Sequence, residues 1–168
     1  MIVLGIDTAL RKTGYGVVEF GSSSRLQVLD CGVIRNGDKL PHSQCLRRIF
    51  SGVEELITSF RPDALSMESA FVCKNVRTGM VLSLARGAVI TSAAIKGIPV
   101  YEYSPKTAKR SAVGMGTASK EQVASVLAGI FSLDVRQIPD DATDALALAL
   151  CHGNIACRPE LAAGLQSL

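Results

Sequence analysis

Residues 1–7 read MIVLGID, an uninterrupted apolar run that ends in a single carboxylate, Asp7. A run of β-branched and aliphatic residues without polar alternation is typical of a strand that is buried on both faces of a layered α/β domain. A buried charge is costly unless it is paired or binds a metal ion. Asp7 could simply cap a turn, and for one aspartate taken alone that interpretation is preferable. Three further carboxylates in positions that could converge on Asp7 favour a site instead.

The rest of the chain predicts a mixed sheet that is covered by helices. Further strands are expected over 13–20, 26–34, 64–68 and 99–103, with helices over 41–60, about 78–96, about 119–130 and 140–152. Short connections make the first three strands an antiparallel meander, whereas helical crossovers lead to the last two. The order β-β-β-α-β-α-β-α-α therefore predicts an α/β domain with a five-stranded mixed sheet, three strands antiparallel and two parallel. One domain is expected over 1–156, followed by a short tail over 157–168.

Composition limits the class of protein. The 168 residues suffice for one domain, and 48% hydrophobic with 20% charged residues excludes general disorder. Five cysteines, an odd number without C-x-x-C spacing, predict reduced thiols and disfavour a zinc site. A net charge of +3 permits a polyanionic partner without indicating one. We expect no membrane span, because no apolar stretch is long enough to cross a bilayer, and no signal peptide, because Met1 leads directly into a strand. A cytoplasmic protein is therefore expected.

The last predicted helix opens with PDDATDA, which places Asp141 and Asp144 three residues apart on one helix face. Acids in a first turn after proline compensate the helix dipole, and this explains Asp140 and Asp141 better than Asp144. The helix continues as ALALALC without a solvent face, so it is expected to pack into the body of the protein. Its two inner acids are then expected to face the sheet.

Glu68 ends the fourth predicted strand as Asp7 ends the first. If these strands are parallel neighbours, their carboxylates emerge at the same edge of the sheet. Four clustered carboxylates repel one another, and they either take up protons or hold a divalent cation. Oxygen ligands suit Mg²⁺ or Mn²⁺, and a pair of such ions is a common device for in-line displacement at a phosphodiester. Spacing alone therefore favours a metal site, with capping and solvation as the competing interpretation.

Several distinct short motifs follow one another along the chain between residue 2 and about residue 152. They are LGID (4–7), TGYGV (13–17), MESAF (67–71), KN (74–75), ARG (85–87), VYEY (100–103), VGMG (113–116) and DATDALA (141–147). Together they resemble the RuvC family of Holliday-junction resolvases, which have the ribonuclease-H-like fold. Two stretches depart from the family: Thr8-Ala9-Leu10 replaces its usual Pro-Gly, and the tail after His152 is short and only weakly basic.

The resemblance implies an endodeoxyribonuclease that resolves Holliday junctions by paired symmetric nicks, through metal-dependent hydrolysis, in homologous recombination and DNA repair. It implies the following catalytic and metal-binding acids: Asp7, Glu68, Asp141 and Asp144. The implied cofactor is Mg²⁺, with Mn²⁺ as a substitute. Phe71 matches an aromatic residue that stacks on a base near the crossover, and Lys109 and Lys120 match basic residues near the scissile phosphate. The implied partners are four-way junction DNA, a second copy of the chain and a branch-migration motor complex.

Basic residues surround the predicted acidic edge. They are Arg11, Lys12, Lys74, Arg77, Lys106, Lys109, Arg110 and Lys120. Lysines and arginines that flank an acidic cluster suit a phosphodiester substrate, because they hold phosphates while the acids hold metal. Lys74 and Arg77 therefore join Phe71, Lys109 and Lys120 as DNA-binding candidates. A four-way junction has approximate two-fold symmetry, which favours a two-fold dimer. The small-residue helix over 78–96 is the candidate interface, and a helix packed in the core is the alternative explanation of its pattern.

Three other functions remain open from the sequence. The Gly-Ile-Asp strand with a following glycine turn also begins the actin and sugar-kinase ATPase domains, although those need a second lobe. A junction-binding module without cleavage is a second alternative. The third is a nuclease of the same fold that acts on ribosomal RNA precursors or RNA–DNA hybrids, since fold alone does not fix the substrate.

Overall fold

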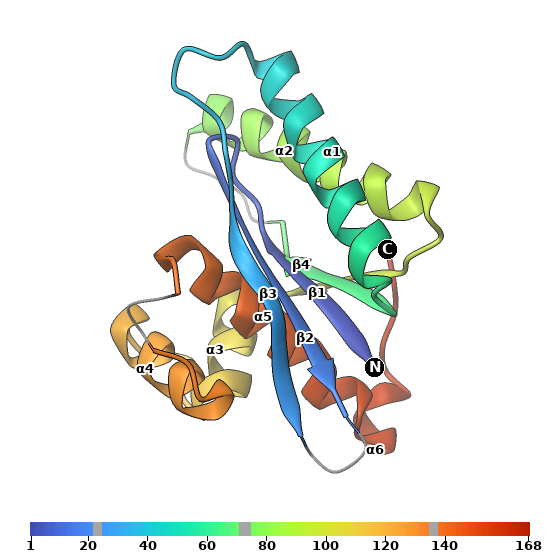
Figure 1. Ribbon diagram of the computed structural model, residues 1–168, viewed down its shortest axis with the longest axis vertical. Coiled ribbons are helices and arrows are strands. Elements are labelled where there is room, and N and C mark those ends of the chain that lie inside the picture. The colour runs from blue at the N-terminus through green and yellow to red at the C-terminus, as the bar shows by residue number, and fades with distance from the viewer. Residues whose placement is uncertain (22–24, 71–74, 135–137) are drawn as a thin grey trace.

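The computed structural model describes residues 1–21, 25–70, 75–134 and 138–168, and it places a sheet between two layers of helices (Figure 1). The strands are β1 (Ile2–Asp7), β2 (Lys12–Phe20), β3 (Leu26–Arg35), β4 (Ala64–Glu68) and β5 (Val100–Tyr103). The helices are α1 (His42–Phe60), α2 (Val76–Ile95), α3 (Pro105–Val113), α4 (Lys120–Phe131), α5 (Asp140–Ala156) and α6 (Pro159–Ala162). The predicted α/β class is confirmed.

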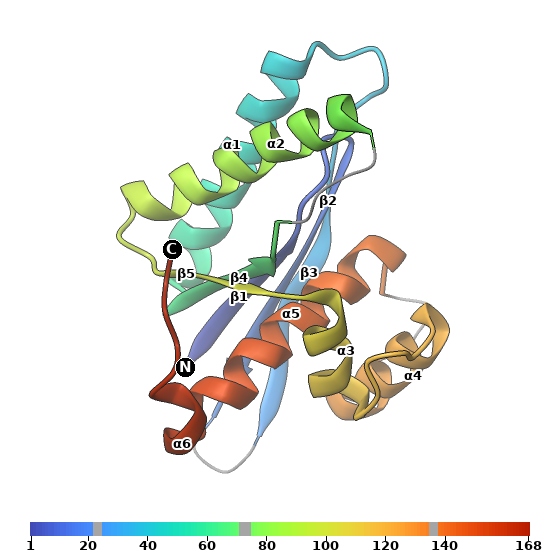
Figure 2. The same ribbon diagram turned by 180° about the vertical axis from the view of Figure 1, so that it is seen from behind.

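The five-stranded sheet has the order β3-β2-β1-β4-β5, with β1 at its centre. β2 pairs antiparallel with both β1 and β3, whereas β4 runs parallel to both β1 and β5. The prediction that the first and fourth strands are parallel neighbours is therefore confirmed. Helices α1 and α2 cover one face of the sheet, and α5 with α3 and α4 covers the other, as the two opposite views show (Figure 2).

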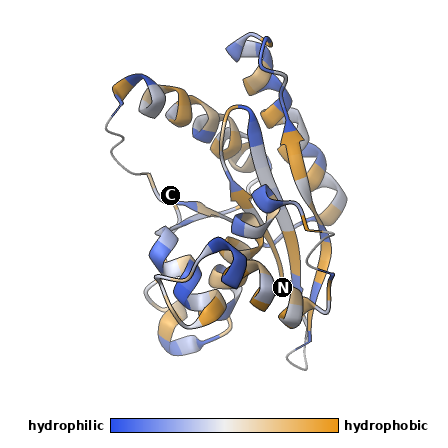
Figure 3. Cartoon of the chain, turned by 90° about the vertical axis from the view of Figure 1, so that its left-hand side faces the viewer, coloured by the Kyte–Doolittle hydropathy of each residue, from blue (hydrophilic) through white to orange (hydrophobic). Residues whose placement is uncertain are grey.

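Successive side chains of β1 pack against the helices on opposite faces of the sheet. Leu4 and Ile6 pack with α1 and α2, whereas Val3 packs with α5 and α4, and all three are fully buried. Hydrophobic positions are accordingly prominent along the strands (Figure 3). A strand that is buried on both faces needs no polar alternation, which is why the opening run is continuously apolar.

Glycines let α5 lie directly on the centre of the sheet. A Cβ added at Gly5 would collide with the backbone carbonyl of Ala145, and one added at Gly14 would collide with that of Asp141. Gly14 is paired with Asp7 across β1 and β2. The missing side chain at residue 14 therefore brings the first turn of α5 beside the end of β1.

Two helices were absent from the predicted order. The segment between the last predicted strand and the helix expected from about 119 forms α3. The Ser104 hydroxyl caps α3 by accepting from the Thr107 N–H, and the helix ends at Gly114 in the left-handed region, φ 77°. The proline at its first position fits a helix start. α6 is a four-residue helix after α5. The predicted division at residue 156 stays a prediction, although the Leu168 N–H donates to the Val100 carbonyl over 2.9 Å.

The expectation that no segment is long and apolar enough to cross a membrane was wrong by those two criteria. α2 has 20 residues, and an 18-residue stretch of it has a mean hydropathy of 1.4 with 28% of the stretch buried. It packs along α1 and buries Ala85, Val89 and Ala93 between the two helices and the sheet. Its outer face is also apolar, with Met80 and Leu84 exposed, and this face raises the hydropathy.

Candidate active site

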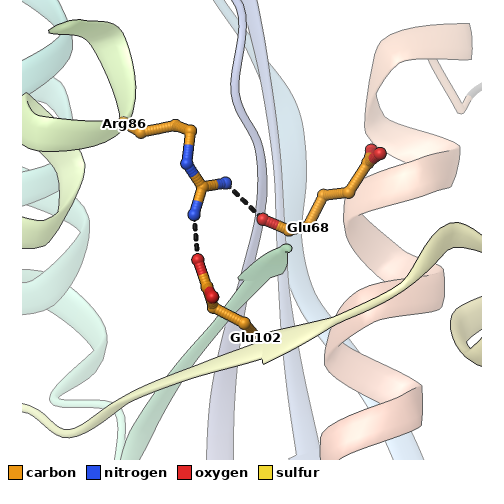
Figure 4. A network of polar contacts seen from close by, with 3 residues as sticks. All are labelled: Glu68, Arg86 and Glu102. Atoms are coloured by element: carbon orange, nitrogen blue, oxygen red, sulfur yellow. Dashed lines mark hydrogen bonds and ion pairs between the residues drawn. The ribbon is translucent and has the colours of Figure 1, made fainter. Parts of the chain in front are cut away.

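Strand alternation turns the first two predicted acids toward α5. Met67 packs in the layer of α1 and α2, so its neighbours Ser66 and Glu68 point the other way, and the Ser66 hydroxyl donates to the Leu148 carbonyl of α5 over 2.6 Å. The Glu68 carboxylate likewise points toward α5 (Figure 4). Asp7 follows Ile6 with the same alternation. Because Ile6 pairs with Met67, the two acids lie at the same edge of neighbouring strands, as predicted.

A cavity of about 320 Å³ brings together acids and lysines from five elements. The candidate residues that line it are Asp7, Glu68, Lys109, Lys120 and Asp144. Asp7 and Glu68 come from strand ends, Lys109 from α3, Lys120 from the first turn of α4 and Asp144 from α5. Three of the four predicted acids and both predicted phosphate-binding lysines therefore share one surface hollow.

Asp141, the fourth predicted acid, lies one helical turn before Asp144 and lines an adjoining cavity with Asp140 and Lys120. Its charge still acts on Asp7. The structure thus places Asp141 beside the shared hollow rather than in its lining.

Burial and like charge raise the pKa of Asp7 to about 6, with burial the larger cause and Asp144 and Glu68 the main charges. The pKa of Glu68 is also raised, first by burial and then by Asp144. Arg86 and then Lys120 act against the shift of Glu68, and Lys120 acts against that of Asp7. Negative charge that raises the pKa of Asp7 and of Glu68 favours binding of a cation at this site.

The two lysines have different partners in the cavity. Lys120 Nζ donates to Asp144 Oδ2 over 2.9 Å, and this bond raises the pKa of Lys120. Lys109 Nζ donates to the backbone carbonyl of Ala118 over 2.9 Å. The ammonium of Lys120 is therefore paired with the Asp144 carboxylate, whereas Lys109 is bonded to a backbone carbonyl and not to any of the acids.

The remaining DNA-binding candidates lie elsewhere or outside the described residues. Arg77, at the start of α2, lines a neighbouring cavity of about 470 Å³ with Arg11 and His42. Phe71 and Lys74, which sequence reasoning assigned to DNA contact, fall outside the described residues. The structure therefore brings Lys109 and Lys120 to the acids and places Arg77 on an adjacent surface.

The donor set fits a hard divalent cation. Three carboxylates converge on one cavity. The buried hydroxyl of Thr8, which lines the adjoining cavity with Asp7 and Glu68, has no hydrogen-bond partner among the described residues. Carboxylate and hydroxyl oxygens are the ligand types that Mg²⁺ prefers. Over residues 1–21, 25–70, 75–134 and 138–168, no three His, Cys, Asp or Glu side chains stand close enough to coordinate one ion together. The residues present therefore fit the cation by chemistry, without a closed ligand shell.

Sequence reasoning missed a contact made by Arg86, which lines an adjoining cavity of about 280 Å³ together with Asp7 and Glu68. Arg86 of α2 donates from Nη1 to the backbone carbonyl of Glu68 and from Nη2 to Glu102 Oε1 of β5 (Figure 4). The arginine is 9% exposed. Arg86 and Glu102 belong to two of the motifs quoted above, ARG and VYEY, but their spacing in the sequence gives no sign that they meet.

A central β1, a parallel β4 and a helix crossing both, with acids at the strand ends, are the arrangement of ribonuclease-H-like nuclease domains. The family model described as crossover junction endodeoxyribonuclease RuvC matches residues 3–152. The chain belongs to the RuvC family.

Relatives and solved structures agree with this membership. A crossover junction endodeoxyribonuclease RuvC from Chlorobaculum parvum is 44% identical over 151 residues, which cover 90% of this chain and 80% of that protein. The structure of Thermus thermophilus RuvC in complex with a Holliday junction substrate matches with a TM-score of 0.89 and 32% identity, covering 100% of this chain and 99% of that one. The yeast mitochondrial Holliday junction resolvase, at 16% identity and a TM-score of 0.60, shares the fold, with 89% of this chain and 77% of that one covered.

Proposed function

We propose that this protein is a structure-selective endodeoxyribonuclease that resolves Holliday junctions by paired symmetric nicks, and so acts in homologous recombination and DNA repair. The observation that carries the proposal is the convergence of Asp7, Glu68 and Asp144 with Lys109 and Lys120 on one cavity, in a chain of the RuvC family. The solved relative bound to a Holliday junction covers the whole chain, which supports the same substrate here.

The proposed reaction is hydrolysis, in which water attacks the phosphorus and the bond to the 3′ oxygen breaks. Asp7 and Glu68 are held at strand ends and Asp144 on a packed helix, so the backbone already brings the three carboxylates to one cavity. Their side chains would still have to draw closer to share an ion. Lys109 and Lys120 hold the phosphate by charge. Lys120 must release Asp144 to do so, and the entering phosphate replaces the carboxylate as its partner.

Members of the family are metal-dependent nucleases, and the ion we propose here is Mg²⁺, with Mn²⁺ as a substitute. Asp7, Glu68 and Asp144 would hold it, with Asp141 close by. When bound, the ion supplies positive charge that lowers the pKa of a nearby water and stabilises the charge that develops on the phosphate.

The exposed face of α2 supports a homodimer. Val76, Met80 and Leu84 recur at four-residue spacing, so they form one stripe, and each is more than half exposed. An exposed apolar stripe on a helix is a common protein–protein interface. Two copies joined through α2 would present two active sites to a two-fold junction. We also propose a branch-migration motor complex as a further partner. The proposed location is the cytoplasm.

A cleavage assay with four substrates tests the proposed function. Labelled four-way junction, linear duplex, structured RNA and RNA–DNA hybrid are incubated with the protein, with Mg²⁺ or with chelator. We expect Mg²⁺-dependent, paired nicks in the junction and much slower cleavage of the other three. Preferential cleavage of either RNA-containing substrate, or junction binding without any nick, would contradict the proposal.

A further inference from the structure

We propose that Arg86 is a positioning residue for Glu68: it holds the end of β4 to α2 and β5, so that the Glu68 carboxylate faces the acidic cavity. This inference rests on the proposed function, because it takes Glu68 to be a ligand of the catalytic cation.

The contacts of Arg86 join three elements at the point where β4 ends. Its guanidinium donates to the main-chain carbonyl of Glu68, the last residue of β4, and to the side chain of Glu102 on β5. On the β1 side, the described pairing of β4 ends at Met67. Beyond that position the strand is held from the β5 side, where the Ser69 N–H donates to the Tyr103 carbonyl over 2.9 Å. Arg86 therefore adds a second anchor at the residue that carries the acid.

The contacts of Arg86 leave the Glu68 carboxylate available to bind a cation. The positive charge of Arg86 contacts the carboxylate of Glu102, whereas the Glu68 carboxylate points away from the guanidinium toward α5 (Figure 4). Arg86 thus binds the peptide of Glu68 without pairing with its side chain. A salt bridge to that side chain would compete with a cation, and this arrangement avoids it.

Stability alone is a weak reason for this pair. Desolvation of a buried ion pair offsets most of its attraction, so replacement by apolar residues is often neutral. The side chains of Arg86 and Glu102 are 11% and 25% exposed, so the pair is partly buried and part of this offset applies to it. Fixing the geometry of a ligand is a better account, since groups that orient metal ligands typically change affinity or activity by about 10- to 100-fold when mutated.

Two variants break the anchor from opposite sides. Arg86→Lys keeps the charge, but a single ammonium cannot replace a planar fork that donates to two acceptors. Glu102→Gln keeps the size and removes the partner charge. Lys96→Gln is the matched control, since Lys96 ends the same helix and pairs with Glu54 of α1 at 3.1 Å, both about 38% exposed.

The experiment measures four quantities on each intact variant: cleavage rate at saturating junction and Mg²⁺, junction Kd, Mn²⁺ Kd by calorimetry without DNA, and Tm. For Arg86→Lys we expect a cleavage rate lower and a Mn²⁺ Kd higher by about 10-fold or more, with an unchanged junction Kd. Glu102→Gln should also lower the cleavage rate and raise the Mn²⁺ Kd, but by less than Arg86→Lys. Lys96→Gln should change neither the cleavage rate nor the Mn²⁺ Kd. If Arg86→Lys does not fold, Glu102→Gln decides alone.

A lowered Tm with wild-type cleavage rate and wild-type Mn²⁺ affinity would overturn the positioning role and leave Arg86 as a structural residue. Glu68→Gln separates this failure from failure of the proposed function. If the wild type cuts junctions and Glu68→Gln does not, but the two anchor variants behave as wild type, only the role of Arg86 is wrong. If Glu68→Gln binds Mn²⁺ and cuts like the wild type, the assignment of Glu68 itself is wrong.

Discussion

Gly14 of β2 lies directly against the backbone carbonyl of Asp141, the second residue of α5, and leaves no space there for a Cβ. Since Gly14 also pairs with Asp7, one small residue brings the acid at the end of β1 next to the acids of α5. The position of the helix relative to the sheet therefore determines whether the carboxylates can share a cation.

Gly14→Ala should disrupt cleavage more than folding. The added methyl meets main-chain atoms that cannot rotate away, so the first turn of α5 must shift. Overpacking of this kind costs about 1–3 kcal/mol of stability, whereas a displacement of about 1 Å at a catalytic group can cost about 100-fold in rate. Cleavage rate and urea denaturation on the same preparation measure the two effects.

Gly129→Ala is the control for that substitution. Gly129 is exposed on α4, and an added Cβ meets no described atom within 4 Å. Alanine in a helix stabilises by about 0.5–1 kcal/mol relative to glycine, so this variant should be slightly more stable and equally active. Gly14→Ala with wild-type activity would show that the close contact does not position the site.

Lys120→Gln should separate metal binding from cleavage. Removing a positive charge that pairs with Asp144 and acts on Asp7 takes away a competitor for the cation. The Mn²⁺ Kd should therefore fall, while cleavage slows because the phosphate loses a partner. Calorimetry and single-turnover cleavage measure the two quantities, and Lys39→Gln, on an exposed turn before α1, is the control. Weaker metal binding in Lys120→Gln would contradict this assignment.

The raised pKa of Asp7 predicts how stability depends on pH in the metal-free protein. The folded protein holds this proton up to about pH 6, whereas the ordinary value is 3.8. Asp7 therefore stabilises the fold below about pH 4, and this contribution is lost as the pH rises through 6, by up to about 3 kcal/mol. In chelator, the free energy of unfolding of Asp7→Asn should increase relative to that of the wild type as the pH rises from 4 to 7. Mg²⁺ should make this difference between the two proteins smaller. A difference that does not vary with pH would contradict the charge cluster.

His152 predicts the opposite trend at acid pH. The residue is 2% exposed, and its Nδ1 forms a hydrogen bond with the Tyr103 hydroxyl over 2.8 Å. Its ring stacks on that of Tyr101 with the ring centroids 4.4 Å apart. Burial lowers its pKa from 6.5 to about 4. Its contribution to stability is therefore complete above pH 6.5 and is lost as the pH falls toward 4, by about 1.4 kcal/mol per unit. His152→Gln should remove this slope in chemical denaturation, and Tyr103→Phe should keep it at lower overall stability.

The strand-end acids could be predicted because their cause is local. An apolar strand that ends in a carboxylate occurs twice, and a helical crossover allows the two strands to be parallel neighbours, so Asp7 and Glu68 were expected to meet if the strands pair. The pairing of Ile6 with Met67 meets that condition. The spacing of Asp141 and Asp144 was equally informative, although only Asp144 reaches the shared cavity.

The parts that sequence reasoning missed depend on contacts between distant segments. α3 is a helix of only nine residues that ends at Gly114, and the bond between Arg86 and Glu102 joins a helix to a strand that pairs elsewhere. The role of Gly14 becomes visible only when α5 is placed on it. No periodicity in the sequence reports such contacts.

Junction cleavage and junction binding by Asp7→Asn test the central claim most directly. Asparagine keeps the size of the side chain and removes its charge, so the shared cation site is lost while the surrounding lysines remain. We predict that Asp7→Asn binds the four-way junction with nearly wild-type Kd and does not cut it at any Mg²⁺ concentration. Cleavage by this variant at a rate close to that of the wild type would contradict the proposed active site.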